Sequence, residues 1–124
     1  MMLKTFALAA ALVLGTVIPA SAESMCSEPI APAALDGSTA TQAQLLAAKT
    51  DVLTFLKQSD DYQDCIIKEL KDAKDAALKA KKDLDPTLAP AVDAKVKSNQ
   101  ALKEKVGAEF NAAAIAYNAK HPGK

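Results

Sequence analysis

The sequence predicts an all-α fold, a long antiparallel two-helix hairpin of coiled-coil type with a disulfide-stapled, proline-rich N-terminal segment. Three observations predict it. Alanine, lysine and leucine are abundant while tryptophan is absent, which favours helix over sheet. Residues 41–83 contain no Gly and no Pro, and a second helical pattern follows a short proline-containing loop. The two cysteines stand before and within the first helical stretch, so one bridge can tie the N-terminal segment to it.

Residues 1–22 predict a Sec-type signal peptide. Lys4 supplies the positive region, residues 6–18 are nearly all apolar, and Ala20-Ser21-Ala22 is a small-x-small cleavage site. The apolar run is shorter than the ~20 residues of a membrane-spanning helix, which makes a transmembrane anchor the weaker alternative. We therefore expect cleavage after Ala22, a periplasmic location and no membrane span in the mature chain.

Residues 23–40 predict an extended lead-in, because Pro29 and Pro32 disfavour helix and Asp36-Gly37 favours a turn. Thr41-Gln-Ala-Gln44 matches a capping box, so the first helix is expected to begin there. We place the helical hairpin in residues 41–124, with the first helix over about residues 41–84.

The first helix carries a heptad pattern, with steps of four and three residues through positions 52, 56, 59, 63, 66, 70, 73, 77, 80 and 84. Ser59 and Gln63 interrupt its apolar character. Ser59-Asp60-Asp61 is rich in capping residues and could start a new helix, but we favour a continuous one. Prolines predict a loop at residues 85–89 and a second helix over about residues 90–119. The apolar positions of that helix are Val92, Val96, Leu102, Val106, Phe110, Ala113 and Tyr117.

All four aromatic residues of the mature chain are expected in one zone at the open end of the hairpin. With the turn near residue 87, Phe110 would face residues 62–64 and Tyr117 would face Leu56. Phe55 and Tyr62 are seven residues apart on the first helix, as Phe110 and Tyr117 are on the second. The four rings predict an aromatic core, and a ligand pocket between them is the alternative.

Cys26 and Cys65 can form an intrachain disulfide. The lead-in from Thr41 back to Cys26 spans at most ~50 Å when extended, and the helix from Thr41 to Cys65 spans about 36 Å. A bridge would close a loop of about 40 residues and add roughly 3–4 kcal/mol of stability. We predict this pairing, while an interchain disulfide or two free thiols remain the alternatives.

Several short motifs occur in a recognisable order along the chain. They are Cys26 with Pro29 and Pro32, Asp36-Gly37, Lys49-x-x-Val52-x-x-Phe55, Tyr62-x-x-Cys65, Phe110-Asn111 and Tyr117-Asn118. The order resembles a group of small, uncharacterised, exported helical-hairpin proteins of Gram-negative bacteria. The resemblance implies the hairpin fold and the Cys26–Cys65 pair, and it implies no activity.

Charge and motifs exclude several classes of function. The chain has 15 lysines, 15 acidic residues and no arginine, so it lacks the basic character of a nucleic-acid-binding domain. Residues 68–105 are basic, with ten lysines and seven acids, whereas residues 23–67 hold two lysines and seven acids. His121 is the only histidine, and Asp61 with Asp64 offers too few ligands for calcium. We expect no catalytic residue, no metal site, no cofactor and no enzymatic activity.

These features predict a periplasmic protein that acts through helix-mediated contacts. Residues 45–53 of the first helix are expected to extend past the second helix, leaving an apolar seam for a second copy or for another envelope protein. One alternative is a holdase-type chaperone with a basic-tipped arm. The other is a small-ligand carrier that uses Phe55, Tyr62, Phe110 and Tyr117.

Overall fold

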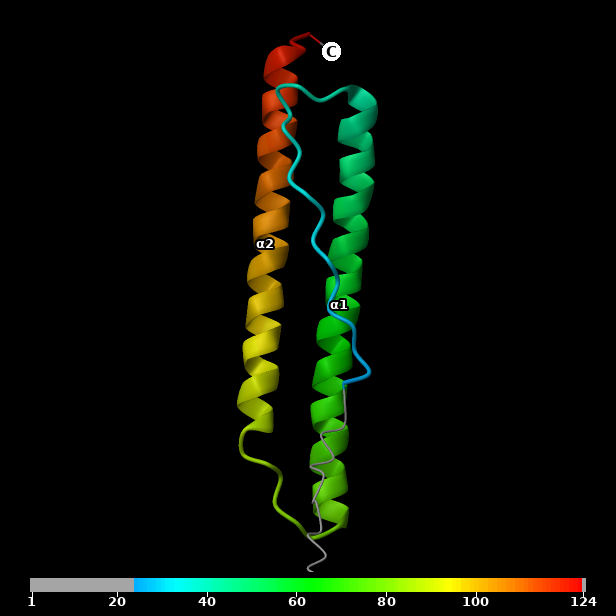
Figure 1. Ribbon diagram of the computed structural model, residues 1–124, viewed down its shortest axis with the longest axis vertical. Helices are drawn as coiled ribbons and strands as arrows, with labels where there is room; N and C mark the ends of the chain where they lie inside the picture. The colour runs from blue at the N-terminus through cyan, green and yellow to red at the C-terminus, as the bar shows by residue number, and fades with distance from the viewer. Residues whose placement is uncertain (1–23, 124) are drawn as a thin grey trace, which may run out of the picture.

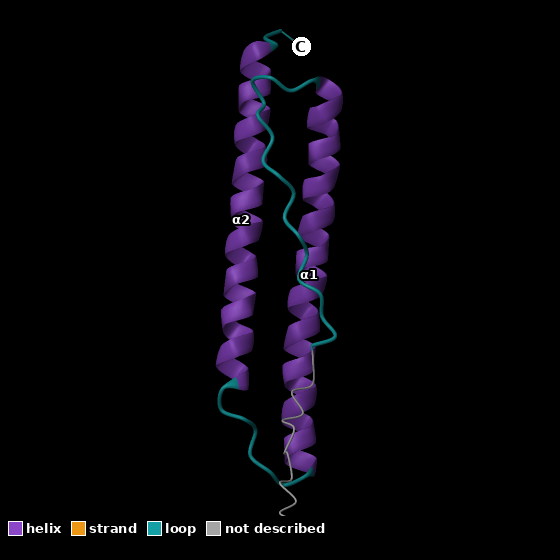
Figure 2. Cartoon of the chain, viewed as in Figure 1, coloured by secondary structure: helices purple, strands orange, loops and turns teal. Residues whose placement is uncertain are grey.

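The computed structural model describes residues 24–123, which form two long helices and an extended N-terminal segment (Figure 1). Helix α1 spans Gln42–Lys79 and helix α2 spans Leu88–Lys120. The helices pack side by side and antiparallel, and no strand occurs among the described residues (Figure 2). The predicted all-α hairpin is therefore confirmed. The predicted signal peptide lies outside the described residues.

Residues 24–40, which we call the strap, form a third layer. Figure 1 shows the strap crossing from the start of α1 to α2 and then running back between the two helices. Phe55 and Tyr62 on α1 are buried, with exposed fractions of 2% and 6%, and the strap contributes Ala31 and Cys26 to their clusters. The strap thus covers apolar surface that the two helices alone would leave exposed.

The start of α1 has the predicted capping box. The backbone N–H of Gln44 donates to the Thr41 hydroxyl over 3.1 Å, and the backbone N–H of Thr41 donates to the Gln44 side chain over 2.9 Å. These two bonds satisfy amides that have no partner within the helix. The helix then continues without a break through Ser59–Asp61, as predicted.

The end of α1 differs from the prediction, because the helix stops at Lys79 rather than near residue 84. Lys81 adopts a left-handed conformation with φ of 52°. The backbone N–H groups of Lys82 and Lys81 donate to the carbonyls of Ala77 and Leu78, over 3.0 and 3.2 Å. This is the Schellman pattern, which terminates a helix and usually uses glycine at the left-handed position. Because lysine stands at this position, no glycine marks the end of the helix in the sequence.

The loop occupies residues 80–87 instead of the predicted 85–89, and α2 begins at Leu88 instead of about residue 90. Asp85 orders the turn: its carboxylate accepts hydrogen bonds from the Thr87 backbone N–H (2.9 Å) and hydroxyl (2.7 Å). Both hydrogen bonds lower the pKa of Asp85, and the bond from the Thr87 backbone N–H has the larger effect. Pro90 falls in the first turn of α2, where a missing N–H costs no helical hydrogen bond.

The pairing of the two helices is shifted relative to the prediction. A turn near residue 87 would have placed Asn99 opposite Asp75, but Asn99 contacts Ser59. The loop folds back beside α1, so the C-terminal turns of α1 project beyond the first turn of α2 (Figure 1). At the open end α2 reaches past the start of α1 (Figure 1). The expectation that residues 45–53 extend past the second helix is therefore wrong.

The core consists of two apolar clusters along the helix interface. One contains Val52, Phe55 and Val106, and the other contains Tyr62, Ile66 and Val92. On α1 the buried positions are 52, 55, 59, 62 and 66, so Phe55 and Tyr62 replace the expected Leu56 and Gln63. The strap explains this rotation, because α1 packs against α2 on one side and against the strap on the other.

Candidate functional site

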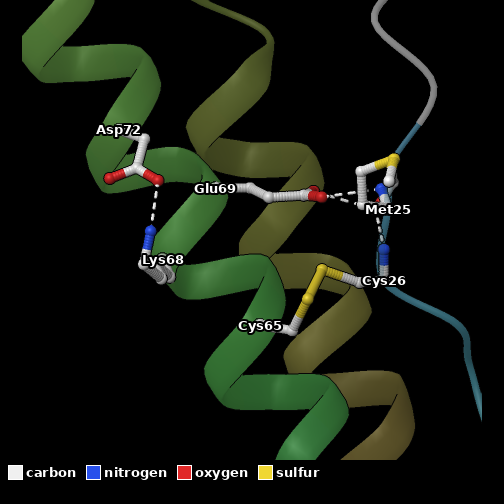
Figure 3. Close-up of a disulfide and its surroundings, with 7 residues drawn as sticks. Met25, Cys26, Cys65, Lys68, Glu69 and Asp72 are labelled. Atoms are coloured by element: carbon white, nitrogen blue, oxygen red, sulfur yellow. Dashed lines mark hydrogen bonds and ion pairs between the residues drawn. A yellow bond between two sulfur atoms is a disulfide. The ribbon is translucent and has the colours of Figure 1, made fainter.

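The disulfide fixes the N-terminal end of the strap. Cys26 and Cys65 are bonded, with their Cα atoms 5.8 Å apart, so the predicted intrachain bridge is confirmed. Figure 3 shows the Glu69 side chain pointing at the strap one turn beyond the bridge. The Glu69 carboxylate accepts hydrogen bonds of 2.8 Å from the Ser24 hydroxyl and from the Met25 backbone N–H. A covalent bond and a charged hydrogen-bond acceptor therefore hold the same short segment.

The other end of the strap is fixed by a tight turn against α2. The Asp36 carboxylate accepts hydrogen bonds from the Ser38 hydroxyl (2.6 Å) and backbone N–H (3.0 Å). Both hydrogen bonds from Ser38 lower the pKa of Asp36, and the bond from the hydroxyl has the larger effect. Gly37 is buried against Ala113, and a Cβ atom at Gly37 would lie 2.6 Å from the Ala113 carbonyl carbon and would overlap its oxygen. Glycine is required here by close approach of two backbones.

A layer of polar side chains separates the two apolar clusters. Ser59 and Asn99 are both fully buried. The Asn99 side-chain amide donates to the Ser59 hydroxyl over 3.3 Å, and the Gln63 amide donates to the Asn99 side-chain oxygen over 2.8 Å. Lys103, which is largely buried, forms an ion pair with Asp60 beside this layer. No buried side-chain polar atom of the described residues lacks a partner.

Such a layer specifies how two helices pair. A buried polar group is costly unless its partner is opposite, so a sliding of α1 along α2 would leave Asn99 unsatisfied. The prediction treated Ser59 and Gln63 as interruptions of the seam and did not include Asn99. The available signal was the spacing of Asn99, which lies seven residues from both Val92 and Val106.

The four aromatic residues do not form one zone. Phe55 and Phe110 pack in the first apolar cluster, whereas Tyr62 belongs to the second. Tyr117 stacks on His121, with ring centroids 4.2 Å apart. The shifted helix pairing is the physical reason, since it moves Phe110 away from Tyr62 and against the cluster of Val52, Phe55 and Val106.

Tyr62 lies under the strap beside the disulfide. Its burial raises the pKa of its hydroxyl, and the nearby negative charges of Glu28 and Glu69 raise it further. The hydroxyl is therefore protonated at neutral pH and does not serve as a base. No partner that could activate it as a nucleophile is hydrogen-bonded to it among the described residues.

A groove of about 390 Å³ opens between the strap and the two helices near the open end. Strap residues 32–35 form one wall. The apolar side chains of Val52, Val106 and Phe110 line it, together with the carboxylates of Asp51 and Glu109. We call this the strap groove.

A second groove, of about 410 Å³, lies at the loop end beside Ser24, the first residue that the structure describes. It lies between α1 and α2. Its apolar lining comprises Met25 of the strap and Ile66, Leu70, Ala73, Leu88 and Val92 of the two helices. Glu69, Asp72 and Lys95 add charged groups to it. We call this the loop-end groove.

No set of side chains suited to a metal ion was found among residues 24–123 beyond one cluster at the disulfide. That cluster comprises Cys26, Cys65 and Glu69, but the two sulfur atoms are bonded to each other and are not thiolate ligands. The Asp61 carboxylate is paired with Lys57 over 2.9 Å rather than with Asp64. His121 ends α2, with its ring Nδ1 2.9 Å from the Tyr117 carbonyl oxygen.

The fold and these features define a small α-helical hairpin whose N-terminal strap is covalently stapled to the first helix. Within the described part of the chain, neither helix has the length and apolarity to cross a membrane. No protein-family model, no curated protein and no solved structure matches the chain. Function therefore has to be inferred from the surface and the grooves themselves.

Proposed function

We propose that this is an exported, periplasmic, non-enzymatic protein that acts by binding a protein segment at the loop end of its hairpin. The observation that carries the proposal is the loop-end groove, because apolar side chains of both helices lie open in it. Export is supported by the signal-peptide pattern of residues 1–22 and by the disulfide, since disulfides persist in oxidising compartments.

Apolar side chains are exposed toward this end of the hairpin. Leu78, in the projecting C-terminal turns of α1, is 76% exposed. Met25, which lines the groove, is 90% exposed. Exposed apolar groups that adjoin an apolar groove favour a protein partner, which would bury both together.

The partner is either a second copy of the chain or another envelope protein, and light scattering separates these versions. Mature protein, beginning at Glu23, should be compared at 5 and 100 µM with a Leu78→Lys variant. A dimer that Leu78→Lys disrupts supports the homodimer. A strict monomer excludes it and leaves a different partner protein.

A photo-crosslinker placed at Leu78 tests contact with another protein in the cell. The control position is Ile115, which is 71% exposed on α2 at the opposite end of the hairpin. We expect discrete crosslinked products from position 78 and none from position 115. Equal crosslinking at both positions, or none at either, would exclude the loop end as the contact surface.

A second candidate function is a holdase-type chaperone, and the lysines at the loop end favour it. Lys74, Lys79, Lys81 and Lys82 form no ion pair with any other described residue, and all four are exposed. Positive charge near the exposed side chain of Leu78 suits unfolded segments that are apolar and acidic.

Aggregation of an unfolded outer-membrane protein at low salt tests the chaperone function. Suppression at stoichiometric amounts that weakens when the four lysines are replaced by glutamine supports it. A lack of suppression by the wild-type protein contradicts it.

A further inference from the structure

We propose that the strap groove is a binding site for a small amphiphilic amine, a ligand with an apolar body and a single cationic head group. This site lies toward the end of the molecule opposite the loop-end groove and is independent of the protein contacts proposed above. Its volume of about 390 Å³ falls within the range of small-molecule sites, roughly 300–1,000 Å³.

The wall of the groove is held in place without a ligand. Strap residues 32–35 lie between two fixed points, the Cys26–Cys65 bridge and the contact of Gly37 with Ala113. The capping box at Thr41 fixes the chain directly after the second point. A ligand therefore enters a preformed site and spends little binding free energy on ordering the strap.

The interior of the groove suits an apolar body. Val52 and Val106 are buried in its lining, with exposed fractions of 9% and 3%, and Phe110 adds an aromatic surface. Alanines on two sides contribute only methyl groups, which leaves the space between the strap and α1 unfilled. These alanines are Ala33, Ala34, Ala47 and Ala48.

The charges of the groove select the head group. The ionisable side chains that line it are both acids, Asp51 on α1 and Glu109 on α2. Asp51 forms no ion pair with another described residue, and the Lys105 contact of Glu109 is 3.8 Å long. Carboxylates on both helices attract a cation and repel an anion, so a fatty acid is disfavoured although its apolar chain would fit.

Decylamine is the probe, with decanol and decanoate as matched molecules of equal chain length, all below their micellar concentrations. Binding is followed by NMR of alanine and valine methyl groups and by calorimetry on the mature, disulfide-bonded protein. We expect decylamine to shift the NMR signals of the Ala48 and Val106 methyl groups. Decylamine should bind more tightly than decanol, and decanoate should bind most weakly.

Two variants locate the site. Asp51→Asn should weaken decylamine binding about two- to fivefold and leave decanol binding unchanged, because an exposed ion pair contributes little more than this. Ala47→Leu fills the groove from an exposed position and should abolish binding of both molecules. Asp64→Asn, an exposed acid on α1 away from the groove, is the matched control and should change nothing.

Three results would overturn the proposal. They are equal affinity for all three probes, decylamine binding that Asp51→Asn leaves intact, and methyl shifts confined to the loop-end groove. Circular dichroism of each variant, with unchanged helix content, confirms that loss of binding is not loss of fold.

Discussion

Removal of the disulfide should lower the free energy of unfolding by an amount that follows from the size of the loop it closes. The bridge joins residues 39 apart in the sequence. In the chain-entropy account, closing a loop of about 40 residues restricts the unfolded chain and stabilises the fold by about 4 kcal/mol. Two long helices with a thin core have little stability to spare, so this is a large share of the total.

The test replaces both cysteines by serine, which avoids leaving one reactive thiol. Urea unfolding followed by circular dichroism at 222 nm gives the free energy of unfolding of the wild-type protein and of the variant. We expect a loss of 2–4 kcal/mol, which is about the value the chain-entropy account gives. Mass spectrometry with and without reductant establishes that the wild-type protein is oxidised.

The location of the loss is also predicted. The strap has no helical hydrogen bonds of its own, so it should detach first and expose Tyr62, which is 6% exposed beneath it. The near-UV signal of Tyr62, measured in a Tyr117→Phe background, should change before the helical signal does. Equal unfolding free energies, or helix loss that precedes the Tyr62 change, would refute the reasoning.

Four further predictions concern single positions. Asn99→Ala removes the donor to the fully buried Ser59 hydroxyl and the 2.8 Å acceptor of the half-buried Gln63 amide, and should lower the unfolding free energy by about 1–3 kcal/mol in urea melts. Lys81→Gly removes the strain of a left-handed lysine and should raise the unfolding free energy by about 1 kcal/mol. An unchanged urea midpoint would contradict the Schellman ending. Gly37→Ala should push the strap off α2, which proteolysis within the strap would detect. The pKa of Asp36 is lower in the folded protein than the ordinary value of 3.8. Its contribution to stability is therefore present above pH 3.8 and is lost as the pH falls through the pKa of the folded state. Asp36→Asn should remove this part of the acid sensitivity of stability.

The elements of the fold were predictable from local sequence signals. Thr41 and Gln44 indicate the start of α1, and the absence of Gly and Pro predicts its continuity. The end of α1 was not predictable, because Lys81 adopts a backbone conformation that the sequence does not mark. Capping residues can indicate where a helix starts, but a helix end that depends on tertiary packing has no local sequence signal.

The pairing of the helices was beyond sequence reasoning for a related reason. It depends on how far the loop folds back. The loop is shaped by the left-handed Lys81 and by the hydrogen bonds of the Asp85 carboxylate, and apolar periodicity marks neither. An error in pairing then misplaced the aromatic residues and the exposed apolar surface. The disulfide did not depend on pairing, because it joins the strap to α1 alone, and it was predicted correctly.

The two fixed points of the strap become available at different times as the chain is made. Cys26 and Cys65 both exist once about half of the chain has been synthesised, whereas Gly37 must wait for Ala113, close to the C-terminus. If the chain is exported N-terminus first, as the proposed function implies, oxidation can join the strap to α1 before α2 has reached the oxidising compartment. α2 then packs against α1 and the strap together, which reduces the number of positions that it can adopt along α1.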